Sequence, residues 1–151
     1  MYLRGNKHIM KKIFTYLSMI LIIFSLVGCN KTNESNNIEV NIGKSTKFTQ
    51  EEINKAIDCL KSDFNLEACT LTKIYYDEEK SNTTIENYFQ FGKGSENNVK
   101  PENVIALLSD FDVDDSGDNP VLNPGETYTD YNWILIRDDK DSDWKIDDFG
   151  F

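Results

Sequence analysis

Histidine is almost missing from this chain of 151 residues, whose one histidine is His8. The sequence after residue 8 therefore has no imidazole to act as a base or as a metal ligand. This excludes Ser-His-Asp and Cys-His nucleophile activation and His-ligated zinc or iron in that part of the chain. General acid or base chemistry there is left to carboxyl groups, lysine or tyrosine.

Basic residues are also scarce, with 16 Lys and Arg against 26 Asp and Glu. Four of the basic residues and none of the acidic ones lie in residues 1–28. Residues 29–151 thus keep 12 basic against 26 acidic residues, a formal charge of −14. This charge argues against a nucleic-acid partner, because neutralising phosphates requires clustered Lys and Arg. It is compatible with a basic protein partner.

One apolar run is long enough to be a targeting segment. It extends from Ile13 to Val27 and follows Arg4, Lys7, Lys11 and Lys12. Its length of about 15 residues is less than the roughly 20 that a helix needs to cross a bilayer, so a membrane helix is the weaker interpretation. A charged segment followed by such a run is typical of a signal peptide.

The end of this run, Leu26-Val27-Gly28-Cys29, resembles the lipobox of bacterial lipoproteins. The resemblance implies cleavage between Gly28 and Cys29 and attachment of lipid to the Cys29 thiol. The protein would then be anchored at the outer face of the cytoplasmic membrane, with residues 1–28 removed. Residues 29–47, rich in Asn, Ser, Thr and Lys, predict a flexible tether. Residues 48–151 are enough for one small domain.

Helical and strand patterns alternate within residues 48–151. Thr49 followed by Glu52 has the form of a capping box, and apolar residues at helical spacing follow it, so a helix is predicted to begin there. Residues 69–76 predict a strand and residues 81–91 a short helix. Residues 104–113 fit either a helix or a strand buried on both faces. Residues 131–137 and 144–151 predict an antiparallel hairpin.

Four segments resemble small lipoproteins of Gram-positive bacteria whose exported part is an NTF2-like or cystatin-like roll. The segments are Tyr76–Glu79, residues 103–111, Trp133–Arg137 and Trp144–Asp148. The resemblance implies an α+β fold in which an N-terminal helix packs on a curved antiparallel sheet of about four strands, with a strand at residues 104–112. It implies no activity, because such lipoproteins are mostly of unknown function and enzymes with this roll often use a pocket His or Asp.

Three groups of residues are candidates for a site. Cys59 and Cys69 lie in an exported chain, where a disulfide can persist; two reduced thiols are the equally acceptable alternative. Asp112, Asp114 and Ser116 have the spacing that opens a calcium loop, but Asn123 stands where a bidentate Glu should complete it, so they are weak candidates. The third group consists of aromatic residues on predicted strands that could line a ligand pocket: Tyr75, Trp133 and Trp144.

These patterns predict a lipid-anchored protein outside the membrane whose domain binds a small molecule or a basic protein without catalysis. No cofactor is indicated. One alternative is a hydrolase or isomerase that uses pocket carboxylates in the same roll. Another is an acidic inhibitor or immunity protein that neutralises a basic toxin by charge complementarity. A closed apolar cavity with a buried Asp of raised pKa would favour the enzyme, and an open or acid-lined surface would favour a protein partner.

Overall fold

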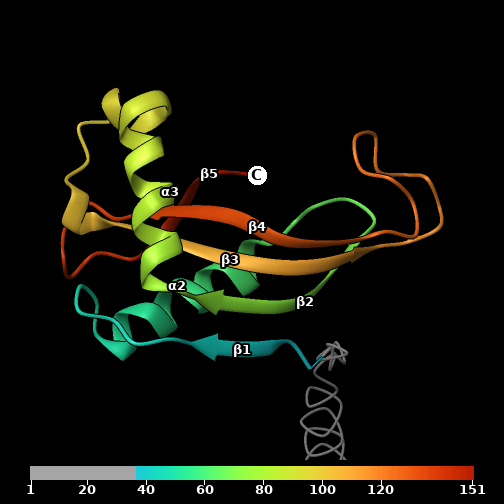
Figure 1. Cartoon of the computed structure of the whole chain (residues 1–151), viewed down its shortest axis with the longest axis horizontal. Coiled ribbons are helices and arrows are strands. Elements are labelled where there is room, and N and C mark those ends of the chain that lie inside the picture. Colours follow the sequence, from blue (N-terminus) through green and yellow to red (C-terminus); the bar gives the residue numbers. More distant parts are fainter. Residues whose placement is uncertain (1–36) are drawn as a thin grey trace, which may run out of the picture. The chain divides into compact units, whose positions relative to one another are not determined.

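Five strands form one sheet in the computed structural model, which describes residues 37–151 (Figure 1). The strands are β1 (Glu39–Ile42), β2 (Cys69–Tyr76), β3 (Val104–Val113), β4 (Thr127–Ile136) and β5 (Lys145–Gly150), and they lie in that order across the sheet. β1 is parallel to β2, whereas the other neighbours are antiparallel. The sheet is therefore mixed and open.

Two helices cover opposite faces of this sheet: α2 (Gln50–Asp63) and α3 (Glu78–Phe91). Along β3, Ile105 and Leu107 belong to the buried cluster that includes α2, while Val104 and Ala106 belong to the cluster that includes α3. β4 divides in the same way between the two clusters. We call the two sides of the sheet the α2 face and the α3 face.

Burial on both faces explains why the sequence of residues 104–113 fits a helix as well as a strand. A strand with one wet face alternates apolar and polar residues, but one covered on both faces is apolar throughout and loses that alternation. The structure makes this segment a strand, with eight of its ten residues buried. The strand at residues 69–76 and the hairpin are also found, with β4 beginning earlier than predicted, at Thr127.

The capping box predicted at Thr49 is present. The Thr49 hydroxyl accepts a hydrogen bond from the Glu52 amide at 3.2 Å, and the Glu52 carboxylate accepts one from the Thr49 amide at 2.9 Å. These bonds satisfy backbone donors that the first turn of a helix leaves free. α2 is nevertheless not the N-terminal element, because β1 precedes it.

Two features of the predicted organisation are wrong. β1 lies inside the segment predicted as a flexible tether, and residues 45–47 are hydrogen-bonded to Tyr76, Glu78 and Asn82. Polar composition was misleading there, because a short edge strand requires few apolar side chains. The sheet also has five strands and one parallel pair, in place of about four antiparallel strands. The α+β class is confirmed. Cys29 and the predicted signal peptide, residues 1–28, lie outside the described residues.

α3 begins where β2 ends, and one of its side chains replaces β2 as a hydrogen-bond partner of the β3 backbone. Asp77 caps the helix by accepting a hydrogen bond from the Lys80 amide at 2.9 Å, so the helix starts three residues before the predicted Ser81. The Ser81 hydroxyl is buried and accepts the Ala106 amide of β3 at 3.2 Å. This satisfies a central-strand donor beyond the end of β2, since a buried amide without a partner is costly.

A buried ion pair joins the start of α2 to the end of β4. The Arg137 guanidinium donates to the Glu52 carboxylate at 2.8 Å and lies over the Trp144 ring, 4.4 Å from its centroid. The Trp144 indole donates to the Glu52 carbonyl at 3.1 Å. Burial alone would raise the pKa of the Glu52 carboxyl, but the hydrogen bonds from Thr49 and Arg137 outweigh it and lower that pKa to about 2.

Acid should therefore weaken the fold through Glu52. Because its pKa is lower in the folded state, this carboxylate stabilises the protein above pH 4.5 and loses that contribution as the pH falls towards 2. We expect its share of the fall in unfolding free energy to be up to about 3 kcal/mol. Denaturant titrations at several pH values should show a shallower acid dependence for Glu52→Gln than for wild type. The exposed Glu51→Gln variant is the control, and an equally shallow slope for it would contradict the assignment.

Candidate functional site

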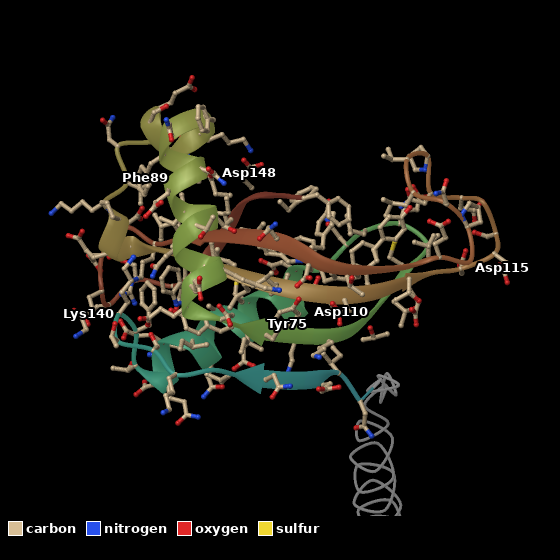
Figure 2. The ribbon with its side chains drawn as sticks, in the orientation of Figure 1. Tyr75, Phe89, Asp110, Asp115, Lys140 and Asp148 are labelled. Carbon is tan, nitrogen blue, oxygen red and sulfur yellow. The ribbon has the colours of Figure 1, made fainter. Side chains whose placement is uncertain are left out.

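The part of the α3 face that α3 leaves uncovered carries a group of polar side chains. Lys73 and Tyr75 come from β2, Asp110 from β3, Asp130 from β4 and Lys80 from the first turn of α3. Figure 2 shows Tyr75 and Asp110 next to each other beside α3. Lys73 pairs with Asp110 and Tyr75 with Leu108 across β2 and β3, so these side chains share one face. We call this group the Asp130 cluster.

Irregular strand pairing positions the cluster. The register between β2 and β3 shifts between Leu71 and Lys73, and that between β3 and β4 shifts between Ser109 and Phe111. Such bulges bend a strand and redirect a side chain. Here Asp130 takes a left-handed backbone conformation with φ of 59°, and its amide donates to the Asp110 carboxylate at 3.2 Å.

One carboxylate oxygen is the centre of the cluster. Asp130 Oδ1 accepts hydrogen bonds from the Tyr75 hydroxyl and from the Lys80 ammonium, the latter at 2.6 Å. The ammonium groups of Lys73 and Lys80 lie 5.3 and 5.7 Å from the centroid of the Tyr75 ring, within the range of cation–π attraction. The side chains of Lys80 and Asp130 are 50% and 55% exposed, so their ion pair is worth only about 0.2–1 kcal/mol.

The protonation states in the cluster suit binding better than proton transfer. Burial, followed by the neighbouring Asp130 carboxylate, raises the pKa of the Tyr75 hydroxyl. Hydrogen bonds from Lys80 and Tyr75 lower the pKa of the Asp130 carboxyl. Near neutral pH the pair is therefore a fixed anion beside a neutral donor, whereas an effective general acid or base has a pKa near the working pH.

Two open hollows flank the cluster. The larger, about 560 Å³, has Thr83, Thr84, Leu108 and Asn132 among its lining residues. The smaller, about 270 Å³, lies towards β1. Asp77 and Lys80 line both hollows, so the Lys80 side chain lies on the boundary between them. Both hollows are open to the surface and neither is an enclosed cavity.

A family model described as a domain of unknown function, DUF4829, matches residues 30–150. The chain belongs to the DUF4829 family. Among curated proteins and among solved structures, no match was found. The DUF4829 match includes β1, in agreement with the place of that strand in the sheet.

The DUF4829 domain does not bring the three predicted pocket residues together. Tyr75 belongs to the Asp130 cluster on the α3 face. Trp133 is buried on the α2 face, where its indole donates to the Ser109 hydroxyl at 2.8 Å. Trp144 is buried against Arg137 and Phe48. Both tryptophans therefore serve the core.

The two cysteines of the DUF4829 domain are free and make separate contacts. The Cys59 thiol donates to the Trp144 carbonyl at 3.2 Å, and the Cys69 thiol to the Glu67 carbonyl at 3.2 Å. Burial, together with nearby Asp63, raises the pKa of Cys59 to about 11. Both thiols are partly buried beside the α2-face core.

The predicted calcium residues do not converge. Asp112 accepts a hydrogen bond from Thr127 across the sheet at 2.6 Å, while Asp114 accepts from the Ser116 amide at 2.9 Å within a tight turn. Among residues 37–151, no group of three or more His, Cys, Asp or Glu side chains is arranged to hold a metal ion. The turn itself satisfies the Asp114 carboxylate.

Sequence analysis found Tyr75 but missed Asp130 and Lys80. Asp130 stands in the polar segment TYTD before the apolar part of β4, and Lys80 in an acidic turn. Neither position has a local pattern that indicates a site, because the bulges and the entry of α3 bring them together. The sequence signal for Tyr75 is strand alternation, which places its side chain on the face of the sheet opposite to that of its neighbour Ile74.

The conformation of Asp130 predicts a specific order of stabilities. A side chain in the left-handed region costs about 1 kcal/mol, less for Asn and nothing for Gly. We expect Asp130→Ala to lower the unfolding free energy by about 1 kcal/mol more than Asp130→Asn or Asp130→Gly in denaturant titrations. Asp130→Ala and Asp130→Gly both remove the carboxylate and its hydrogen bonds, so the comparison of these two isolates the backbone. Equal losses in the three variants would contradict it.

Free thiols predict that reduction leaves the domain unchanged. The melting temperature of the protein prepared without reductant should not shift when a reducing agent is added. After unfolding, a thiol reagent should label both Cys59 and Cys69, as peptide mass spectrometry can verify. A mass lower by two hydrogens, or a melting temperature that falls on reduction, would reveal a disulfide.

Proposed function

We propose that this protein is an exported lipoprotein, cleaved between Gly28 and Cys29 and anchored through lipid on Cys29 at the outer face of the cytoplasmic membrane. Support comes from the charged leader, the short apolar run and the lipobox-like residues 26–29. Among the described residues, no helix is long and apolar enough to cross a membrane. Nine residues, 30–38, separate Cys29 from the first residue of β1.

We further propose that the DUF4829 domain is a non-catalytic binding module. The observation that carries this proposal is the Asp130 cluster, an ordered group of donors and acceptors on an uncovered, open sheet face. The carboxyl groups with shifted pKa are Glu52, Glu78, Asp114, Asp130 and Asp139, and every one of these shifts is downward. Ionised carboxylates on an open surface favour binding over a carboxylate hydrolase or isomerase, which needs a protonated acid in a sheltered cavity.

An acidic inhibitor or immunity protein is a special case of this proposal, with a basic exported protein as its target. The formal charge of −14 on residues 29–151 supports it through electrostatic complementarity. The NTF2-like or cystatin-like roll remains a proposal for the fold. In it, α2 would be the helix that packs on the sheet and β2 to β5 the antiparallel sheet, with β1 and α3 as additions.

Anchoring can be tested by substitution of the acylated residue. In fractionated cells, wild-type protein should be found with membranes, with a mass that indicates a lipid-bearing chain beginning at Cys29. Cys29→Ser should retain the unprocessed leader and lack the lipid. Cys59→Ser, which does not change the sequence of the leader or Cys29, is the control and should be processed like the wild type. Identical mass and processing for wild type and Cys29→Ser would overturn the anchoring proposal.

A further inference from the structure

The Asp130 cluster already holds an ammonium group, and that group belongs to the protein itself. Lys80 Nζ donates to Asp130 Oδ1 at 2.6 Å and lies 5.7 Å from the centroid of the Tyr75 ring. A carboxylate together with an aromatic face is a favourable arrangement for a primary ammonium or a guanidinium. The structure thus contains both a cation site and an occupant from the same chain.

The position of Lys80 is not explained by the stability of its own helix. Lys80 lies in the first turn of α3, where the helix dipole disfavours a positive charge. Its backbone amide is capped by Asp77, but that bond does not require a basic side chain. The ion pair with Asp130 is half exposed at both ends, so it is weak and easily exchanged.

We propose that Tyr75 and Asp130 form a binding site for a lysine or arginine side chain of a basic protein partner, and that Lys80 occupies this site until the partner displaces it. The inference rests on the proposed binding function and names its partner chemistry. Lys80 would act as a weak internal competitor. The partner's side chain would take over the bond to Asp130 and the contact with the Tyr75 ring.

The surroundings of Asp130 have room for such a side chain. Within residues 37–151, Asp130 Oδ1 receives both bonds of the cluster, and Oδ2 has no hydrogen-bond partner. The adjoining hollow of about 560 Å³ is lined by the carboxylate-bearing residues Asp77, Glu79 and Asp130. Release of Lys80 would join this hollow to the smaller one, because Lys80 lines both.

The charge of the chain favours a basic protein as the occupant. Residues 29–151 carry a formal charge of −14, which attracts a basic partner and repels anionic ones. A single small amine would gain little from a half-exposed carboxylate. A protein that presents one basic side chain among further contacts can displace Lys80 at little cost.

The competition predicts that removal of Lys80 strengthens binding. The full chain in detergent would be titrated calorimetrically with a hexalysine peptide, and with n-butylammonium as the small-molecule arm. Lys80→Met keeps the stem of the side chain and removes the ammonium. Since an exposed ion pair of this kind holds the site closed only part of the time, hexalysine should bind about two- to six-fold more tightly to Lys80→Met than to wild type.

Charge-matched variants separate this competition from a general effect of net charge. Lys55→Met removes an exposed lysine on α2 that is likewise paired with a carboxylate, that of Glu51. It should tighten hexalysine binding clearly less than Lys80→Met. Asp130→Asn, which suits the left-handed backbone, should weaken binding more than Asp118→Asn in the β3–β4 loop. Both comparisons use variants of equal net charge.

The outcomes distinguish this inference from the proposal on which it rests. Equal binding by Lys80→Met and Lys55→Met, or equal loss in Asp130→Asn and Asp118→Asn, would overturn the site, while hexalysine binding by the wild-type protein would still support the proposed binding function. Absence of hexalysine binding in the wild type and in all four variants would overturn the basic protein as the partner of that binding function. Tighter binding of n-butylammonium than of hexalysine by Lys80→Met would overturn the basic protein as partner in favour of a small amine. Failure of Cys29→Ser to change processing would overturn anchoring and leave the cation site standing.

Discussion

Incomplete coverage of the sheet by α3 is the constraint from which the rest of this surface follows. β3 and β4 each have ten residues, a length of about 33 Å, whereas a helix that runs across them covers a width of about 10 Å. Where α3 lies on the strands, small and branched apolar residues such as Ala106 and Ile134 are buried. Beyond it, the same face must be polar, and Tyr75, Asp110 and Asp130 are found there.

The ordered polar surface depends on how the chain enters α3. β2 stops at Tyr76, the chain turns at the Asp77 cap, and Ser81 then satisfies the backbone of β3 that β2 no longer reaches. This turn sets the first helical residues, including Lys80, above the strand that carries Tyr75. The bulge at Asp130 aims its carboxylate at both. The turn that ends β2 and begins α3 thus also brings the charged side chains of the Asp130 cluster together.

Much of the fold could be predicted because its signals are local. The capping box of Thr49 and Glu52 satisfies donors within one turn, so it marks the start of α2 without reference to the rest of the chain. The strand at residues 69–76 and the final hairpin follow from residue type. β1 was not predictable in this way, because its four residues EVNI are too short a pattern by themselves and form a strand through pairing with β2. The same holds for Trp133. The sequence pattern did not decide whether this side chain lines a pocket or packs in the core.

The sequence by itself determined the acidity of residues 29–151, their lack of histidine, the lipobox-like pattern that ends at Cys29, and the α+β class. These properties depend on composition and on contacts within a few residues. Tertiary structure decided which face each aromatic residue occupies, that Cys59 and Cys69 contact different carbonyl groups, and that Asp130 meets Tyr75 and Lys80. These residues lie about 50 positions apart in sequence. Strand register, bulges and helix entry act over such separations, and no local pattern encodes them.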